Sequence, residues 1–377
     1  MGDRRLTQAS YAASVRTYVP TRGPATRAAE ERARDTGKLD PLVDPAEYGV
    51  IRRSLVRFDP RPDDLWTVTV GLPVPIETRL DTTGSMGHFV DVALEVLPNT
   101  YDLTSAMLPE CDLQIATGIF GDCIDRFVLC RPQFEMEAEK IVRQLSLMAP
   151  QRGGGGNGGE DPHYGIFGGA YLTNAYINRI GLKGYDFTVT DEPARAYLSA
   201  DQLMRIYGEH VFEKVAENGF EINRQNLPTT REVVDDLLKR AHGFVLSVGD
   251  RYNSNRFWME HYGEERVILL PDIRYLAHAQ AVIVGLTEGT LSLEEVEEFM
   301  RKHGVEQSAA RALMRSVVNI PLGAQAALPN FGKGPKAGDV FREKTDLWPM
   351  DPSEVPILHG ADDEPDGPIW GVEDNQI

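Results

Sequence analysis

The residues with the clearest potential for chemistry lie in one short turn, where an apolar run ending at Leu80 meets a helical pattern. Asp81, Thr83 and Ser85 stand at positions i, i+2 and i+4 of this turn. In a strand-to-helix turn, the carboxylate and the two hydroxyls can therefore point at one spot above a sheet. Oxygen donors of this kind suit a hard divalent cation such as Mg²⁺. The turn predicts a metal site, and an ordinary turn with a helix cap is the competing interpretation.

Two other polar loops could reach the same place. Residues 153–162 form a glycine-rich loop that contains Asn157 and Asp161, and Thr190-Asp191 directly follows a run typical of a buried strand. Ligands of open α/β sheets bind at the carboxyl ends of the strands, so these loops are expected to meet the turn at Asp81. The glycine-rich loop is not a P-loop, because no Gly-Lys-Ser/Thr follows. It could also be only a flexible connector.

These loops connect strands and helices that alternate along the chain. The expected elements are strands at 76–81, 113–120, 185–191, 244–248 and 267–270, a hairpin partner at 126–130, and helices at 89–97, 134–148, 164–180, 203–218, 230–240 and 275–285. Alternating strands and helices with one early hairpin predict a doubly wound α/β fold. We expect a mostly parallel six-stranded sheet with one antiparallel edge strand and helices on both faces.

The chain divides into four regions. Residues 1–65 are expected to form an N-terminal arm that is partly helical, and residues 66–286 form the α/β domain. Residues 287–328 form a C-terminal helical hairpin, which opens with a capping box at Ser292 and Glu295. Residues 329–377 are rich in Gly, Pro and acids, and we expect an irregular acidic tail.

Composition narrows the class of protein. The net charge of −18 argues against a general nucleic-acid binder, since phosphate binding needs a basic surface. No run of 18 apolar residues predicts a transmembrane helix, and the first 20 residues lack the apolar core of a secretory signal. The spacing of Cys111, Cys123 and Cys130 matches no zinc pattern, and we expect small buried thiols in a reducing compartment. A cytoplasmic location is the expectation.

The turn Asp81-Thr82-Thr83-Gly84-Ser85-Met86 resembles the metal-ion-dependent adhesion site (MIDAS) of von Willebrand factor type A (vWA) domains, whose usual form is Asp-x-Ser-x-Ser. The resemblance extends over roughly residues 70–286 and includes the order of strands and helices. It also includes Thr190-Asp191 after the fourth core strand, and the Gly-rich loop ending in Glu160-Asp161-Pro162, which is similar to loops of intracellular microbial members.

The resemblance implies a role for each residue of the site. Thr83 and Ser85 would ligate Mg²⁺, or else Mn²⁺ or Ca²⁺, directly through their hydroxyls. Asp81 and Asp191 would act mostly through bound water. The threonine that the family usually has in the middle loop has no clear match here. Its expected substitutes are Asp161 or Asn157.

The function implied by this resemblance is divalent-cation-dependent protein binding, in which a carboxylate of the partner completes the metal coordination. We expect a bacterial adaptor or assembly factor, and many similar microbial proteins act beside an AAA+ ATPase of the MoxR type. One alternative is a structural or assembly subunit that uses the vWA fold as a metal-independent scaffold. Nucleic acid and membranes are not expected as partners.

A second alternative is a metal-dependent hydrolase. Ser85, His163 and Asp191 could be imagined as a triad, but no Gly-x-Ser-x-Gly elbow is present. Asp81 also lacks the second aspartate at +2 that an aspartyl-phosphate phosphatase needs, so no catalytic residue is assigned and an enzyme is not expected. His163 is expected to be a solvated loop residue. Trp258 and Tyr262 belong either to a recognition loop or to a packed helix.

Overall fold

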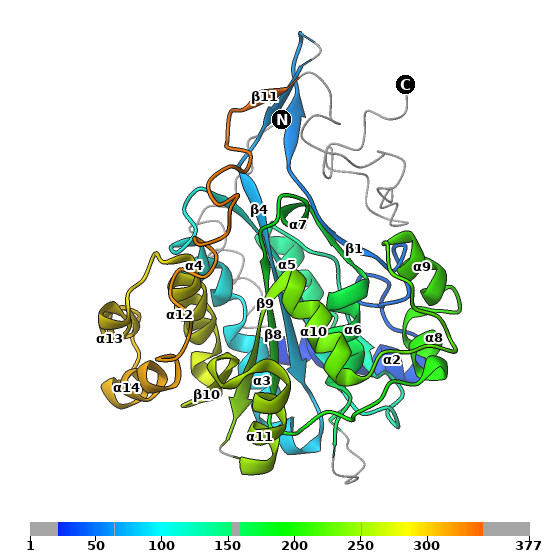
Figure 1. Ribbon diagram of the computed structural model, residues 1–377. Coiled ribbons are helices and arrows are strands. Elements are labelled where there is room, and N and C mark those ends of the chain that lie inside the picture. The colour runs from blue at the N-terminus through cyan, green and yellow to red at the C-terminus, as the bar shows by residue number, and fades with distance from the viewer. Residues whose placement is uncertain (1–21, 64, 153–158, 250, 342–377) are drawn as a thin grey trace.

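A six-stranded sheet forms the centre of the computed structural model, which describes residues 22–63, 65–152, 159–249 and 251–341 (Figure 1). The strand order is β10-β9-β8-β4-β5-β6, and all neighbours are parallel except the antiparallel pair β5 and β6. The strands are β4 (Leu72–Asp81), β5 (Cys111–Phe120), β6 (Leu129–Cys130), β8 (Gly184–Thr190), β9 (Ala241–Val248) and β10 (Val267–Leu270). The predicted doubly wound sheet with one antiparallel edge is confirmed.

Helices cover both faces of this sheet (Figure 1). One face packs against α3 (Gly87–Val96), α4 (Asn99–Ser105), α5 (Ala138–Ser146) and α12 (Leu276–Glu288). The other face packs against α6 (Pro162–Tyr171), α8 (Ala200–Tyr207), α9 (Val211–Glu217), α10 (Thr230–Arg240) and α11 (Tyr252–Tyr262). Each face has its own apolar core, as parallel strands buried on both sides require.

The central strand β4 shows how the sequence supplies both faces. Its side chains alternate between the two sides of the sheet. Ile76 and Leu80 belong to the core beneath α3 and α12, and Thr78 on the same face accepts a hydrogen bond of 2.7 Å from Gln280 of α12. The intervening residues of β4 are charged and lie on the face that α6 covers. The strand therefore carries one apolar and one ionic face.

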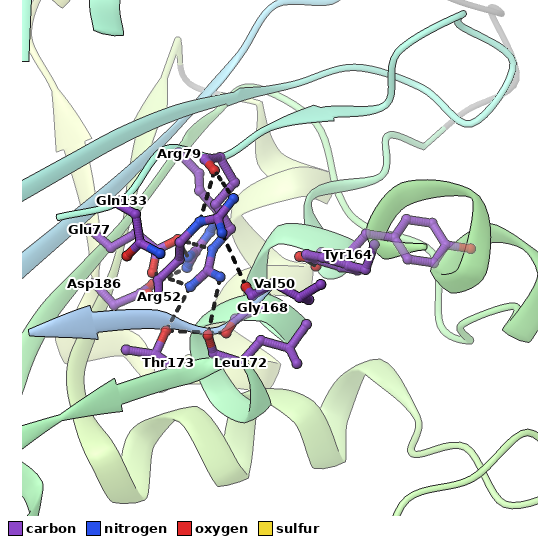
Figure 2. Close-up of polar contacts among 12 residues, drawn as sticks. Val50, Arg52, Glu77, Arg79, Gln133, Tyr164, Gly168, Leu172, Thr173 and Asp186 are labelled. Atoms are coloured by element: carbon purple, nitrogen blue, oxygen red, sulfur yellow. Dashed lines mark hydrogen bonds and ion pairs between the residues drawn. The ribbon is translucent and has the colours of Figure 1, made fainter. Parts of the chain in front are cut away.

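The ionic face of β4 forms a buried network beneath α6 (Figure 2). Arg131, which follows β6, donates to Glu77 at 2.7 Å, and Arg79 forms ion pairs with Glu77 at 3.3 Å and with Asp186 of β8. All four side chains are buried. Gly168 of α6 makes room for them, because a Cβ there would lie 3.0 Å from Arg131 Nε. The network joins β4, β8 and the residue after β6 through charge-assisted hydrogen bonds.

Segments near the two ends of the described chain add two smaller sheets. The strand β1 (Arg52–Ser54) pairs in parallel with β7 (Thr173–Ala175). The strands β2 (Phe58–Pro60), β3 (Trp66–Val68) and β11 (Val340–Phe341) form an antiparallel sheet in the order β11-β3-β2. The helix α2 (Arg22–Thr36) lies where the sequence predicts a helical segment in the N-terminal arm.

Two predicted helices are interrupted. The helix expected at 164–180 is divided into α6, β7 and α7 (Tyr176–Arg179), because β7 pairs with a strand from the N-terminal region that sequence pattern cannot reveal. The helix expected at 203–218 is divided into α8 and α9 at Gly208, whose φ of +88° is readily adopted only by glycine. Both errors arise from reading continuous apolar periodicity across a short break.

Two helices lie in the region where the sequence predicts a C-terminal helical hairpin. The helix α13 (Leu293–Lys302) begins with the capping box at Ser292, whose backbone N–H and hydroxyl both donate to Glu295. The helix α14 (Gln307–Ser316) follows and packs against α13. Within the described part of the chain, no helix combines the length and apolar character needed to cross a membrane.

Candidate functional site

Asp81 lies at the carboxyl end of β4, where the strand order of the sheet reverses. Its Oδ1 accepts hydrogen bonds from the backbone N–H and the hydroxyl of Thr83, at 2.9 and 2.7 Å. Its Oδ2 accepts one from the hydroxyl of Thr190 at 2.7 Å. Burial raises the pKa of Asp81 to about 6, although these hydrogen bonds act in the opposite direction. The carboxylate therefore orients the turn after β4 and joins it to the end of β8.

Thr83 occupies the position before a short 3₁₀ helix, Gly84–Met86, that leads into α3. A helix cap would accept a hydrogen bond from a backbone N–H of that helix. The Thr83 side chain makes no such bond and donates to Asp81 instead. The helix-cap interpretation of this turn therefore does not account for the hydroxyl.

Ser85 is joined to the second predicted carboxylate of the site. Its hydroxyl donates a hydrogen bond of 2.9 Å to Asp191 Oδ1, and Asp191 directly follows β8. The other oxygen, Asp191 Oδ2, forms an ion pair of 2.8 Å with Arg251, which precedes α11. Asp81, Thr83, Ser85 and Asp191 thus lie together, as the sequence predicts for strand ends at one edge of a sheet.

Asp161, in the middle loop, contacts a different set of residues. Its Oδ2 accepts from the backbone N–H of Cys123 and pairs with Arg195. Its Oδ1 lies 3.7 Å from Nε2 of His163. The structure thus brings Asp161 to the loop after β5, and among the described residues it makes no hydrogen bond or ion pair with Thr83 or Ser85. Asn157, the other predicted candidate in this loop, lies outside the described residues.

Glu160 is the acidic residue of the middle loop that sequence reasoning missed. Burial, followed by the negative charges of Asp81 and Asp122, raises its pKa to about 8, while the nearby Thr83 hydroxyl lowers it. Within the described chain, the buried Glu160 Oε2 has no hydrogen-bond partner. Its backbone N–H donates to the carbonyl of Pro193 at 3.1 Å, which holds it beside the end of β8. The signal was present in Glu160-Asp161, where either acid could have been considered.

The donor set fits a hard divalent cation. Three carboxyl groups (Asp81, Glu160 and Asp191) and two hydroxyls (Thr83 and Ser85) converge here, and every donor is an oxygen. Burial first, and then the charges of Asp81 and Asp122, raise the pKa of Glu160, so a further negative charge is unfavourable here, and its Oε2 has no partner among the described residues. A bound cation would offset that charge, as Mg²⁺ and Ca²⁺ sites do with oxygen ligands.

A second polar cluster adjoins this group. Ligand atoms of Asp122, Cys123 and Asp161 lie within 4.8 Å of one another, which would allow a metal ion. Arg195 already pairs with both carboxylates, at 3.2 Å to Asp122 Oδ2, and donates to the Cys123 sulfur at 3.3 Å. Burial and the neighbouring Asp161 charge raise the pKa of the Cys123 thiol to about 12. The guanidinium of Arg195 therefore offsets part of the negative charge of this cluster.

Several single-residue expectations can be compared with the structure. The expectation of a solvated His163 is wrong: the ring is fully buried at the start of α6, and burial lowers its pKa to about 3. The ring nitrogens have no hydrogen-bond partner among the described residues. Ser85 donates directly to Asp191, so His163 does not lie between them as a triad would require.

Trp258 and Tyr262 are buried in α11, so the helix-packing interpretation is correct and the recognition-loop interpretation is wrong. Of the cysteines, only Cys130 is fully buried.

No family model and no curated protein match the sequence. The structure is similar to von Willebrand factor type A from Catenulispora acidiphila, at 10% identity and a TM-score of 0.34, over 63% of this chain and 50% of that one. It is also similar to proximal thread matrix protein 1 of the mussel byssus, at 11% identity and a TM-score of 0.33, over 57% of this chain and 48% of that one. The chain spans about half the length of these proteins, one of which is a von Willebrand factor type A protein.

Proposed function

We propose that this chain is a divalent-cation-dependent protein-binding module. The observation that carries the proposal is the buried Oε2 of Glu160, which has no partner in the described chain although it lies beside Asp81 and Thr83. A cation in this place would be held by Thr83 and Ser85 and balanced by the surrounding carboxylates. Its chemistry would be electrostatic: a localised positive charge on an acidic protein, available to an external carboxylate.

The partner is therefore expected to present an Asp or Glu side chain to the site. The net charge of −18 supports this mechanism, because an acidic surface repels acidic partners except where a cation is exposed. A role as adaptor or assembly factor beside an AAA+ ATPase of the MoxR type, in a bacterial cytoplasm, rests on the resemblance of the Asp81–Ser85 turn alone. Mg²⁺ is the proposed ion, with Mn²⁺ or Ca²⁺ as substitutes.

The first test measures metal binding directly. Metal-free protein titrated with Mn²⁺ in a calorimeter should show saturable binding at one site. Ser85→Ala removes a proposed ligand and should weaken binding by about tenfold or more, whereas Ser85→Thr keeps the hydroxyl and should retain it. Equal affinities in wild type and Ser85→Ala, with both variants folded by circular dichroism, would contradict the metal site.

The second test concerns the partner. Proteins recovered with the tagged full chain in Mg²⁺ should be lost in EDTA and with Asp81→Ala. The metal-independent scaffold is favoured by one observation: the carboxylates already have protein partners. Asp81 accepts hydrogen bonds from Thr83 and Thr190, and Asp191 accepts one from Ser85 and pairs with Arg251. Recovery that is unchanged by EDTA and by Asp81→Ala would support that alternative instead.

A further inference from the structure

A cavity of about 890 Å³ opens at the end of the sheet opposite to Asp81. It lies at the amino ends of β4 and β5, so that the ten residues of β4 separate it from the candidate metal site by roughly 30 Å. The segment between α14 and β11, orange in Figure 1, passes α4 and α12 and supplies Phe331 to the wall. The volume is typical of sites that enclose a small organic molecule.

The cavity wall is mainly apolar. Leu72 and Val74 of β4 line one side together with Leu113 of β5, and Met107 and Leu182 complete the apolar surface. Apolar side chains with a few placed polar groups are the usual composition of small-molecule sites. The polar groups in this wall therefore decide which chemical class the cavity would accept.

Glu288 is the buried acid of this wall. It is the last residue of α12, a helix whose apolar side chains belong to the core. A carboxylate at a helix C-terminus is unfavourable, because the helix dipole is negative there. Burial also disfavours its charge and raises the pKa of Glu288 to about 7. The fold thus places an acid where two physical effects oppose it.

One oxygen of Glu288 remains available to a ligand. Oε1 accepts a hydrogen bond of 2.7 Å from the Tyr185 hydroxyl. Oε2 makes no hydrogen bond among the described residues, and it is not sealed from solvent. Since Glu288 lines the cavity, this oxygen is accessible from it.

The other charged groups of the wall do not compete for this role. Arg57 is held by Asp112 through two hydrogen bonds, at 2.8 and 2.6 Å. Burial and the charge of Glu288 raise the pKa of the neighbouring Cys111 thiol to about 12, so it stays protonated. Glu110 and Lys336 are exposed residues of the wall and carry opposite charges. Among the described residues of the wall, the carboxylate of Glu288 is therefore the one negatively charged hydrogen-bond acceptor inside the cavity.

We propose that this cavity binds an apolar molecule that carries a primary amine. The hydrocarbon part would fill the space between β4, β5 and Phe331, and the ammonium group would donate to Glu288 Oε2. Charge-assisted hydrogen bonds in a low-dielectric pocket are stronger than neutral ones, which selects the amine over an alcohol of the same size. This inference is independent of the proposed metal site.

The test compares three probes of equal chain length on the full protein. Calorimetry in EDTA with n-octylamine, 1-octanol and octanoate should give saturable binding of the amine, with the alcohol weaker by about tenfold and octanoate weaker still. Glu288→Gln should reduce the affinity for the amine by about tenfold and leave that for the alcohol unchanged. This variant removes a buried acid, so it is expected to fold.

A blocking variant tests the location. Val70 is a half-buried residue of the cavity wall, and Val70→Trp should abolish amine binding, whereas Val318→Trp, at an exposed residue that is not part of the wall, should not. Absence of saturable amine binding below about 1 mM would overturn the proposal. Unchanged amine affinity in folded Glu288→Gln, or in folded Val70→Trp, would also overturn it.

Discussion

The hydroxyl of Ser85 and the carboxylate of Asp191 are joined by a hydrogen bond of 2.9 Å although they are 106 positions apart in the sequence. The bond connects the turn after β4 with the turn after β8, the two strands between which the sheet reverses its order. The opposite oxygen of Asp191 is held by Arg251 at 2.8 Å. Asp191 is therefore shared between the proposed metal ligands and an arginine of the next loop.

Removal of that arginine should strengthen metal binding. Arg251 supplies a positive charge next to Asp191, and a cation entering the site would be repelled by it. Its side chain is 45% exposed, so the repulsion is partly screened. Arg251→Gln is expected to tighten Mn²⁺ binding several-fold, measured by calorimetry. Arg256→Gln, on the exposed surface of α11 and paired with Glu260, is the matched control and should leave the affinity unchanged. Weaker binding in Arg251→Gln would show that the arginine supports the site.

Two neighbouring acids allow the middle-loop ligand to be identified. Glu160 lies beside Thr83 and carries an unpartnered oxygen, whereas Asp161 pairs with Arg195. We therefore expect Glu160→Gln to weaken Mn²⁺ binding by about tenfold or more, and Asp161→Asn to have a smaller effect. Electron paramagnetic resonance of bound Mn²⁺ would measure both. The reverse order would assign the ligand to Asp161, as the sequence alone suggests.

The buried ionic face of β4 should be costly to break. Glu77→Gln leaves the guanidinium groups of Arg79 and Arg131 without their shared carboxylate in a buried place (Figure 2). Loss of one partner from a buried pair typically lowers the free energy of unfolding by about 3–5 kcal/mol. Urea unfolding should show this loss, while Glu217→Gln, which breaks an exposed pair with Lys214, should cost about 1 kcal/mol or less. Similar effects of the two substitutions would contradict a buried network.

The stability of the metal-free protein should fall as the pH rises from about 5 to 7. Burial raises the pKa of Glu135 from 4.5 to about 7, although Lys140 acts in the opposite direction. Between these values the folded protein retains a proton that the unfolded chain has lost. The folded state therefore binds more protons, and its free energy of unfolding decreases with pH. Glu135→Gln should make this decrease less steep in urea unfolding followed across pH in EDTA, and an unchanged slope would contradict the assignment.

Much of the fold can be predicted from local pattern. The helix at 230–240 has the expected bounds, because Thr229 and Glu232 form a capping box that defines its start. The break at Gly208 between α8 and α9 was not predicted, because a single glycine within an apolar helical pattern is compatible with a continuous helix. The strand β7 was also missed, because its partner β1 lies more than a hundred residues earlier.

The sequence by itself determined that Asp81, Thr83, Ser85 and Asp191 would meet, because strand ends of a parallel sheet share one edge and short turns hold their spacing. Only the tertiary structure decided which acid of the middle loop faces them. Glu160 and Asp161 are adjacent and chemically alike. The backbone of Glu160 forms an isolated β-bridge with Ala194, and the side chain of Asp161 pairs with Arg195; these two contacts set the directions of the two side chains. The direction of a loop side chain depends on contacts with distant segments, which the order of residues does not contain.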